Sequence, residues 1–187
     1  MPALDYSSNI IEPFAQTTIS LSYDNVYSTF VWNKKADDFD FTSPDKKIAL
    51  EVVSVIPENI IEACKYEKVL AKGKKPTSIN IKMAKIDASG SLISYYGGSM
   101  TEIRRAIIKA IETKHEKAVK RLIKYDVYEL CICTDDGALF NSNLSFDFLL
   151  ESELLSKACF SRIFIITSAH FFVIENSIIS EYERKIS

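Results

Sequence analysis

The sequence has few glycines and few histidines, and these shortages exclude several kinds of active site. Only 5 of its 187 residues are glycine, and it contains neither a GxGxxG pattern nor a Walker A loop, which argues against a nucleotide-binding loop. The two histidines, His115 and His170, lie in no serine or cysteine nucleophile context such as GxSxG. The four cysteines include no CxxC pair, so the spacing of a zinc site is absent as well.

Long hydrophobic runs are also missing. No window approaches the ~18 consecutive apolar residues that a membrane span needs, and the N-terminal stretch MPALDYSSNIIEPF lacks the basic and apolar regions of a signal peptide. We therefore expect a soluble, cytoplasmic protein with no membrane partner. Cys131 and Cys133 are two residues apart in a predicted strand, so they share one face and are expected to be buried free thiols.

The composition that remains is typical of a globular domain. Hydrophobic residues make up 47% of the chain and charged residues 26%, which is enough for a sizeable core at this length. No internal repeat, low-complexity tract or convincing linker divides the sequence. We therefore expect a single domain over residues 1–187.

The net charge of -2 conceals a division along the chain. Residues 65–124 carry 15 lysines and arginines against 5 aspartates and glutamates, whereas the rest of the chain carries 8 against 20. A basic segment of this kind can bind a polyanion, because its cations neutralise phosphates and release counterions. Charge alone, however, favours a solvated lysine-rich helix and hairpin.

Hydrophobic periodicity predicts an α/β domain with a mixed sheet flanked by helices. The segment IALEVVSV, residues 48–55, is too continuously apolar for an edge strand and is expected to be central. The predicted helices are 7–16 near Pro13, 57–73, 99–125 and 145–158. Strands or hairpins are predicted at 17–32, 39–55 with a turn at SPDK, 78–98, 127–134, 162–168 and 170–174, before a polar tail. The helix and hairpin around 57–98 are interpreted as an insertion.

Two charged residues stand where this pattern requires apolar ones. Glu51 lies in the middle of the predicted central strand, and Lys114 lies in the centre of the apolar stripe of the long helix. Burying either charge alone costs several kcal/mol, so each needs a partner, a metal ion or access to water. The two residues either pair with each other, reach solvent at the ends of their elements, or face one functional site.

The segment ADDFDFTSPDKKIALEVVSV and the order of the predicted elements resemble the PD-(D/E)XK nuclease superfamily. That family has a short helix, a β-meander, a long helix, a strand, a helix and a strand. An aspartate begins its second strand, and an acidic residue, one intervening residue and a lysine lie in its third. The acidic groups hold a divalent cation, and the lysine orients the attacking water or stabilises charge during phosphodiester hydrolysis. The resemblance covers about Tyr6 to Val173 and implies a restriction-endonuclease-like fold.

Carried onto this sequence, the resemblance implies a metal site on the second and third strands. Asp38 matches the aspartate, with Asp40 as the alternative, because the strand register is open. Glu51 matches the acidic residue, and the carbonyl of Val52 would face the metal. The sequence departs from the family at the third position, where EVV places Val53 instead of lysine.

Two further residues complete the implied site. Some members of the superfamily carry the lysine on the following helix, and Lys114 lies on the appropriate face for this catalytic role. Glu12, in the N-terminal helix, matches an extra carboxylate of some relatives. Such a site would bind Mg²⁺ or Mn²⁺, since Mg²⁺ takes oxygen ligands and is commonly held by one or two carboxylates plus phosphate.

The resemblance and the basic segment together imply a nucleic-acid partner, which can be either DNA or RNA. The residues expected to contact phosphates are Lys72, Lys74, Lys75, Arg104 and Arg105. The expected function is Mg²⁺-dependent hydrolysis of phosphodiester bonds, or nucleic-acid binding alone in a degenerate member. The alternative is a non-catalytic protein-interaction module on the same fold, and both a monomer and a homodimer are compatible with the sequence.

Overall fold

The computed structural model describes most of the chain outside the predicted insertion. The described residues are 8–33, 38–55, 85–86, 92–94, 100–121, 124–134, 147–151, 153–167 and 169–185. Lys72, Lys74 and Lys75, the predicted helix 57–73 and Leu122 of the predicted apolar stripe lie outside them.

A mixed sheet forms the centre of the described structure, which confirms the α/β class. Its seven strands run in the order β1-β2-β3-β6-β7-β8-β9, and β3, β6 and β7 are parallel to one another while the remaining pairs are antiparallel. β3 (Ile48–Val55) has neighbours on both sides, so its predicted central position is confirmed. The other strands are β1 (Val31–Trp32), β2 (Phe41–Thr42), β6 (Val127–Thr134), β7 (Arg162–Ile166), β8 (Phe171–Glu175) and β9 (Ile178–Tyr182).

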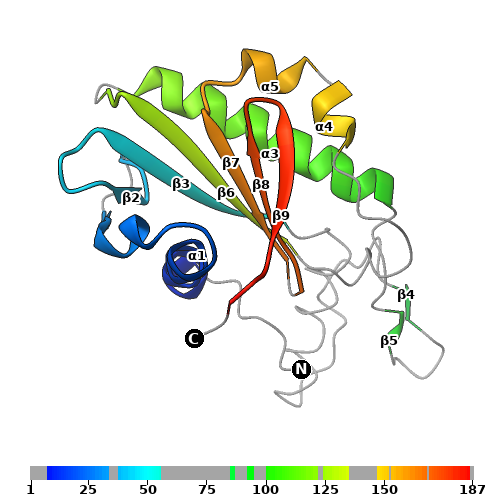
Figure 1. The fold of residues 1–187 in the computed structure, drawn as a ribbon. Helices are drawn as coiled ribbons and strands as arrows, with labels where there is room; N and C mark the ends of the chain where they lie inside the picture. The colour runs from blue at the N-terminus through cyan, green and yellow to red at the C-terminus, as the bar shows by residue number, and fades with distance from the viewer. Residues whose placement is uncertain are drawn as a thin grey trace, which may run out of the picture.

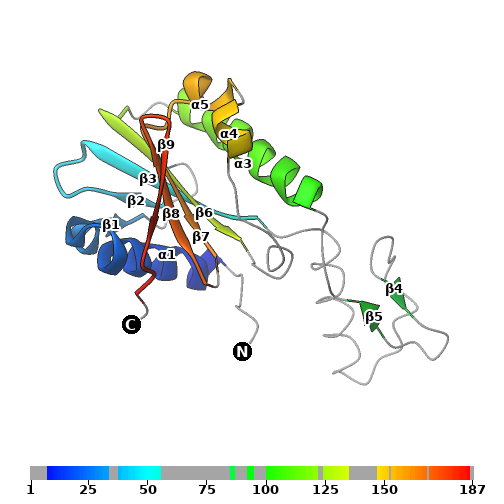
Figure 2. The ribbon, with the colours of Figure 1, turned by 45° about the vertical axis from the view of Figure 1, so that its right-hand side comes forward.

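Helices cover both faces of this sheet (Figures 1 and 2). α1 (Ser8–Ser22) packs on one face, and α3 (Met100–Lys120), α4 (Asp147–Glu151) and α5 (Leu154–Lys157) lie on the other. α3 lies between β3 and β6 in the chain, as a connection between parallel strands requires. The described residues of its predicted apolar stripe face the sheet: Ile103, Ile107, Ile111 and Ala118 are buried, and Ala110 is half-buried.

The N-terminal segment differs from its prediction. The predicted helix at 7–16 continues to Ser22 with Pro13 inside it, the 3₁₀ helix η1 (Asn25–Thr29) follows, and only Val31–Trp32 is extended. The strand or hairpin predicted for 17–32 is therefore wrong over most of its length. Ile11, Ala15 and Ile19 recur every four residues and are all buried, so packing of one helical face overrides the β-branched composition.

The C-terminal part also differs from its prediction. The helix predicted at 145–158 is divided into the two short helices α4 and α5, and the expected polar tail forms the edge strand β9. Asn176 and Ser177 make the turn between β8 and β9 with φ values of 51° and 59°. Positive φ at both central residues is the signature of a two-residue hairpin turn, which here lacks the glycine that usually announces it.

Two predicted hairpins are confirmed. In the SPDK turn, the Lys46 N–H donates to the Ser43 carbonyl at 2.9 Å, and β2 pairs with β3 on either side of it. β4 (Lys85–Ile86) and β5 (Leu92–Ser94), the described part of the hairpin predicted at 78–98, form a separate antiparallel pair.

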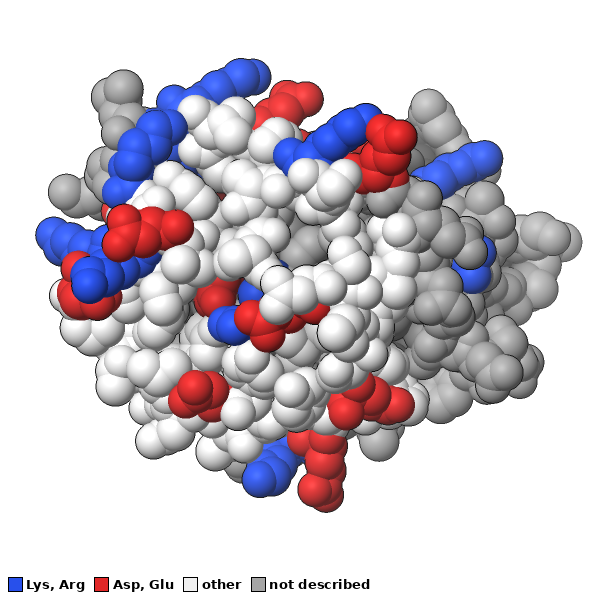
Figure 3. All heavy atoms as spheres, turned by 45° about the horizontal axis from the view of Figure 1, so that its top comes forward, with Lys and Arg blue, Asp and Glu red and all other residues white. Residues whose placement is uncertain are grey.

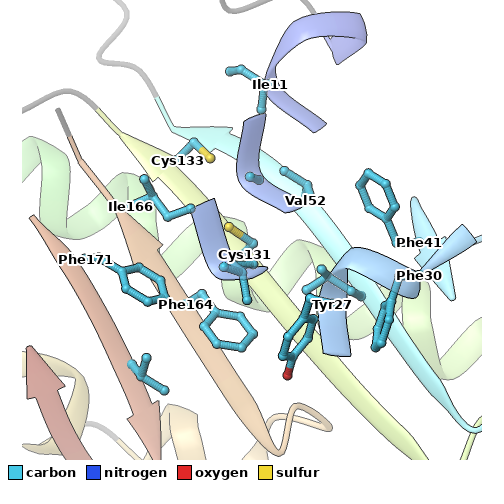
Figure 4. Packing of buried hydrophobic residues seen from close by; sticks show 14 residues of the cluster. Ile11, Tyr27, Phe30, Phe41, Val52, Cys131, Cys133, Phe164, Ile166 and Phe171 are labelled. Carbon is cyan, nitrogen blue, oxygen red and sulfur yellow. The ribbon is translucent and has the colours of Figure 1, made fainter. Parts of the chain in front are cut away.

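The core between α1 and the sheet contains a buried polar cluster. Figure 4 shows the aromatic and sulfur-containing side chains of this core, with Tyr27 of η1 among them. The Tyr27 hydroxyl donates to the Glu129 carboxylate at 3.0 Å and accepts from Arg162 Nη1 at 2.8 Å. Arg162 also forms ion pairs with Glu129 at 2.6 Å and Glu175 at 2.5 Å. Burial raises the pKa of Glu129 to about 7, and the Arg162 charge opposes that rise.

Replacement of Tyr27 by phenylalanine tests the contribution of this cluster. Glu129 is fully buried, so the loss of one donor cannot be compensated by solvent. We expect the Tyr27→Phe variant to lose about 1–2 kcal/mol of unfolding free energy in urea denaturation. Tyr23→Phe is the matched control, because the Tyr23 hydroxyl lies 3.5 Å from Glu175, at the limit of a hydrogen bond. An equal loss in both variants would contradict a specific role for Tyr27.

Candidate functional site

Glu51 is a buried carboxylate held between two cations. Residues alternate along β3, so Ala49, Glu51 and Val53 face the α3 side while Leu50 and Val52 join the α1-side core. Only 4% of Glu51 is exposed. Its Oε1 accepts from Lys114 Nζ at 2.6 Å, and its Oε2 accepts from Arg121 Nη1 at 2.8 Å. The two charges singled out in the sequence therefore do pair with each other.

Arg121 is the member of this site that the sequence reasoning missed. It follows α3 directly and lies seven residues after Lys114, which is two helical turns along the same face. Its guanidinium carbon lies 4.0 Å from the centroid of the Phe39 ring, so the side chain is stacked as well as ion-paired. In the sequence, the spacing of seven residues between Lys114 and Arg121 indicates that the two side chains share one helical face.

Asp40 is the carboxylate that lies beside Glu51. Phe41 pairs with Leu50 across β2 and β3, so Asp40, one residue earlier, extends that register towards Glu51. Its Oδ2 accepts a hydrogen bond from the Val52 N–H at 2.7 Å. Burial raises the pKa of Asp40 to about 7, the nearby charge of Glu51 adds to the rise, and Lys114 opposes it.

Asp38 has different partners. Its Oδ1 accepts from the Tyr125 hydroxyl at 3.0 Å and from the Phe39 N–H at 2.8 Å. Burial, together with this bond to Asp38, raises the pKa of Tyr125 to about 12. Of the two candidate aspartates, Asp40 is thus the one with a hydrogen bond to β3 and an electrostatic interaction with Glu51.

Glu12 approaches the site from the α1 side. Its Oε2 accepts from Trp32 Nε1 at 2.7 Å, and its charge contributes to the raised pKa of Asp40. The predicted extra carboxylate is therefore an electrostatic neighbour of Asp40, and its hydrogen bond from Trp32 joins α1 to β1.

The expected phosphate-contacting residues are only partly described. The Arg104 guanidinium carbon lies 5.1 Å from the centroid of the Phe148 ring, so this side chain packs towards α4, whereas Arg105 is exposed. Figure 3 shows basic and acidic side chains interspersed among the described residues of one face. On that face the described residues do not form a continuous basic patch.

The donor set at Asp40 and Glu51 suits a hard cation. Within the described ranges, no group of three or more histidine, cysteine, aspartate or glutamate side chains is arranged to hold a metal ion. Mg²⁺ commonly takes only one or two protein carboxylates and keeps several waters, so two adjacent carboxylates fit its chemistry. Both Glu51 oxygens already carry a cationic partner, however, and a metal ion would compete with them.

Comparisons with known proteins do not assign this site to a family. No family model matches the sequence, and neither a curated protein nor a solved structure is significantly similar to it. Among the helices that the structure describes, none is both long and apolar enough to cross a membrane. The function is therefore argued from the geometry of the site.

The raised pKa of Asp40 predicts a pH-dependent effect of the Asp40→Asn substitution. The pKa rises from 3.8 to about 7 on folding, so the carboxyl favours stability when protonated and loses that contribution as the pH rises towards 7. The neutral amide keeps an acceptor for the Val52 N–H and does not titrate. We therefore expect the variant to gain stability over wild type as the pH rises, reaching about 1–2 kcal/mol above pH 7, which is less than a fully buried group would give.

Urea denaturation of both proteins at about pH 4.5 and about pH 8 measures this gain. Glu129 titrates in the same range, but it is present in both proteins and cancels in the difference. A difference that is independent of pH, or that falls as the pH rises, would contradict the assigned environment of Asp40.

Proposed function

We propose that this protein hydrolyses phosphodiester bonds of nucleic acid with Mg²⁺ or Mn²⁺. The observation that carries the proposal is the grouping of Asp40, Glu51 and Lys114, with Lys114 Nζ 2.6 Å from Glu51. Two carboxylates and a lysine are the chemical groups that the PD-(D/E)XK resemblance implies. They come here from the residue before β2, from β3 and from α3, and none of them is needed to complete the apolar core.

The order of elements supports a restriction-endonuclease-like fold within this proposal. Apart from η1 and the separate β4–β5 pair, the described elements run α1, β1, β2, β3, α3 and β6, with an antiparallel β1-β2-β3 meander and β6 parallel to β3. This is the helix, meander, long helix and strand order on which the resemblance rests. It brings the start of β2 and the middle of β3 together at one place on the sheet.

Each residue has a distinct role in the proposed reaction. Asp40 and Glu51 would hold the divalent cation, which supplies charge neutralisation and a more acidic water when bound. Lys114 would place its positive charge beside the attacking water and the phosphate, where a partly buried site strengthens its effect. Asp40 replaces Asp38 as the favoured second-strand ligand because Tyr125 holds Asp38.

A degenerate member is the second candidate, and two observations favour it. Glu51 is already neutralised by Lys114 and Arg121, as a purely structural ion cluster would be. Val53 also occupies the family's lysine position and packs against the α3-side core. Such a protein would bind nucleic acid through its basic segment, or a protein partner through its acidic flanks, without cleaving.

Asp40→Asn is the substitution that best tests the hydrolase. It leaves Glu51 with both of its cations, and the amide can still accept from Val52. We expect the variant to lose at least about 100-fold in Mg²⁺-dependent cleavage of a mixture of single- and double-stranded DNA and RNA. Loss of activity in a variant that is as stable as wild type, or more stable, identifies a functional group.

Two comparison variants sharpen this test. Asp38→Asn separates the two candidate ligands, and activity is expected to survive it. Lys114→Gln should reduce cleavage, while Lys120→Gln removes the same charge from a side chain that is 76% exposed and should not. Cleavage by none of the proteins, with nucleic-acid binding that weakens as salt rises, would favour the degenerate member. Cleavage unaffected by Asp40→Asn would reject the proposed site.

A further inference from the structure

Two cations already accompany the carboxylates of this site. Lys114 and Arg121 supply two positive charges, Glu51 and Asp40 supply two carboxylates, and the carboxylate of Glu12 lies near Asp40. The side chains of Lys114 and Arg121 are only 18% and 15% exposed, so these charges are not screened as surface ions would be. A divalent cation added to this group would leave a net positive charge in a partly buried site.

Geometry as well as charge opposes the binding of a cation to the resting site. Lys114 occupies Glu51 Oε1 and Arg121 occupies Oε2, so each oxygen already accepts a short charge-assisted bond. A hard cation that uses Glu51 has to displace at least one of them. The displaced side chain then needs another anion, because a cation left unpaired in such a place is costly.

A substrate phosphate is the anion that fits both displaced groups. Lysine and arginine are common phosphate ligands, and arginine can approach two phosphate oxygens with parallel N–H donors. An open groove of about 260 Å³ lies between β3 and α3, is lined by Val53, Lys109 and Thr113 among others, and ends at Lys114. A phosphate in this groove would reach Lys114 from outside. Arg121 would retain its stacking on Phe39 while its N–H groups turn away from Glu51.

We propose that Arg121, together with Lys114, occupies the cation position on Glu51 in the resting protein and transfers to the substrate phosphate, so that divalent-cation binding and nucleic-acid binding favour each other. This inference rests on the proposed function and adds its regulation. Arg121 has two roles in this scheme: it blocks Glu51 in the absence of substrate and binds the phosphate in its presence. The linkage is reciprocal, so each ligand strengthens the other by the same factor.

The first test is calorimetric titration of Mn²⁺ into protein without nucleic acid. Wild type should bind weakly, and Arg121→Gln should bind on the order of 10-fold more tightly because one competing cation is gone. Lys120→Gln is the matched control: it removes one charge from the neighbouring residue, which pairs with Glu116 and not with Glu51, and its Mn²⁺ affinity should equal that of wild type. Equal or weaker binding by Arg121→Gln, in a variant whose thermal unfolding is cooperative, would overturn the inference.

The second test needs no variant. Mn²⁺ is titrated into wild type with and without saturating phosphorothioate-linked oligonucleotides, as DNA and as RNA, which resist cleavage. The oligonucleotide should tighten Mn²⁺ binding by a factor on the order of 10, and Mn²⁺ should tighten oligonucleotide binding equally. If wild type cleaves nucleic acid but binds Mn²⁺ with the same affinity with and without the oligonucleotide, the coupling is refuted and the proposed function is not. Absence of Mn²⁺ binding under every condition, with no cleavage, would refute the proposed function and the coupling together.

Discussion

A carboxylate in a central strand can be kept only if a cation reaches it, and the arrangement of α3 depends on this constraint. Glu51 lies where an eight-residue strand is otherwise apolar or small, between neighbours on both sides. Lys114 and Arg121 meet it from one helical face, so the rotation of α3 about its axis and its position along β3 are fixed together. The apolar contacts of α3 alone would tolerate small sliding movements, whereas two short ion pairs to one carboxylate would not. Fold and candidate site therefore share the same interaction.

The other face of the sheet satisfies the same constraint in a different way. Leu50 pairs with Glu129 across β3 and β6, so Glu129 points towards α1 while Glu51 points towards α3. Glu129 is enclosed by Tyr27 and Arg162, and Arg162 is in turn paired with Glu175. No groove is needed to explain this cluster, because it joins η1 to three strands of the sheet. Glu51 differs in that its neighbouring carboxylate, Asp40, accepts a hydrogen bond from the backbone of Val52, whereas Glu175 shares the cation of Glu129. Lys114, which pairs with Glu51, also lines the groove between β3 and α3.

The sequence predicted those features that depend on local pattern. The central strand, the long helix, the turn at SPDK and the anomaly of Glu51 and Lys114 could all be read from periodicity. Glu129 carries the same signal, a carboxylate within the apolar strand VYELCICT. The helix described on its side of the sheet, α1, contains no lysine, and its partner Arg162 comes from a strand 33 residues away. The helical state of residues 17–22 depends on burial against the sheet, which composition does not reveal. Arg121 could be inferred from its seven-residue spacing to Lys114 only once Glu51 was known to face α3.

Asp40 is the residue at which stability and proposed function separate. Removing Glu51 would leave two partly buried cations without an anion, so loss of activity in such a variant could not be distinguished from structural damage. Asp40 has the opposite character, because burial and the charge of Glu51 both oppose its ionised form while only one backbone N–H and a partly offsetting lysine favour it. Ionisation of Asp40 therefore lowers the stability of the fold. A carboxylate in that position is explained if it binds a ligand. A divalent cation would relieve the repulsion between Asp40 and Glu51, and a phosphate that arrives with it would pair with the two cations released from Glu51.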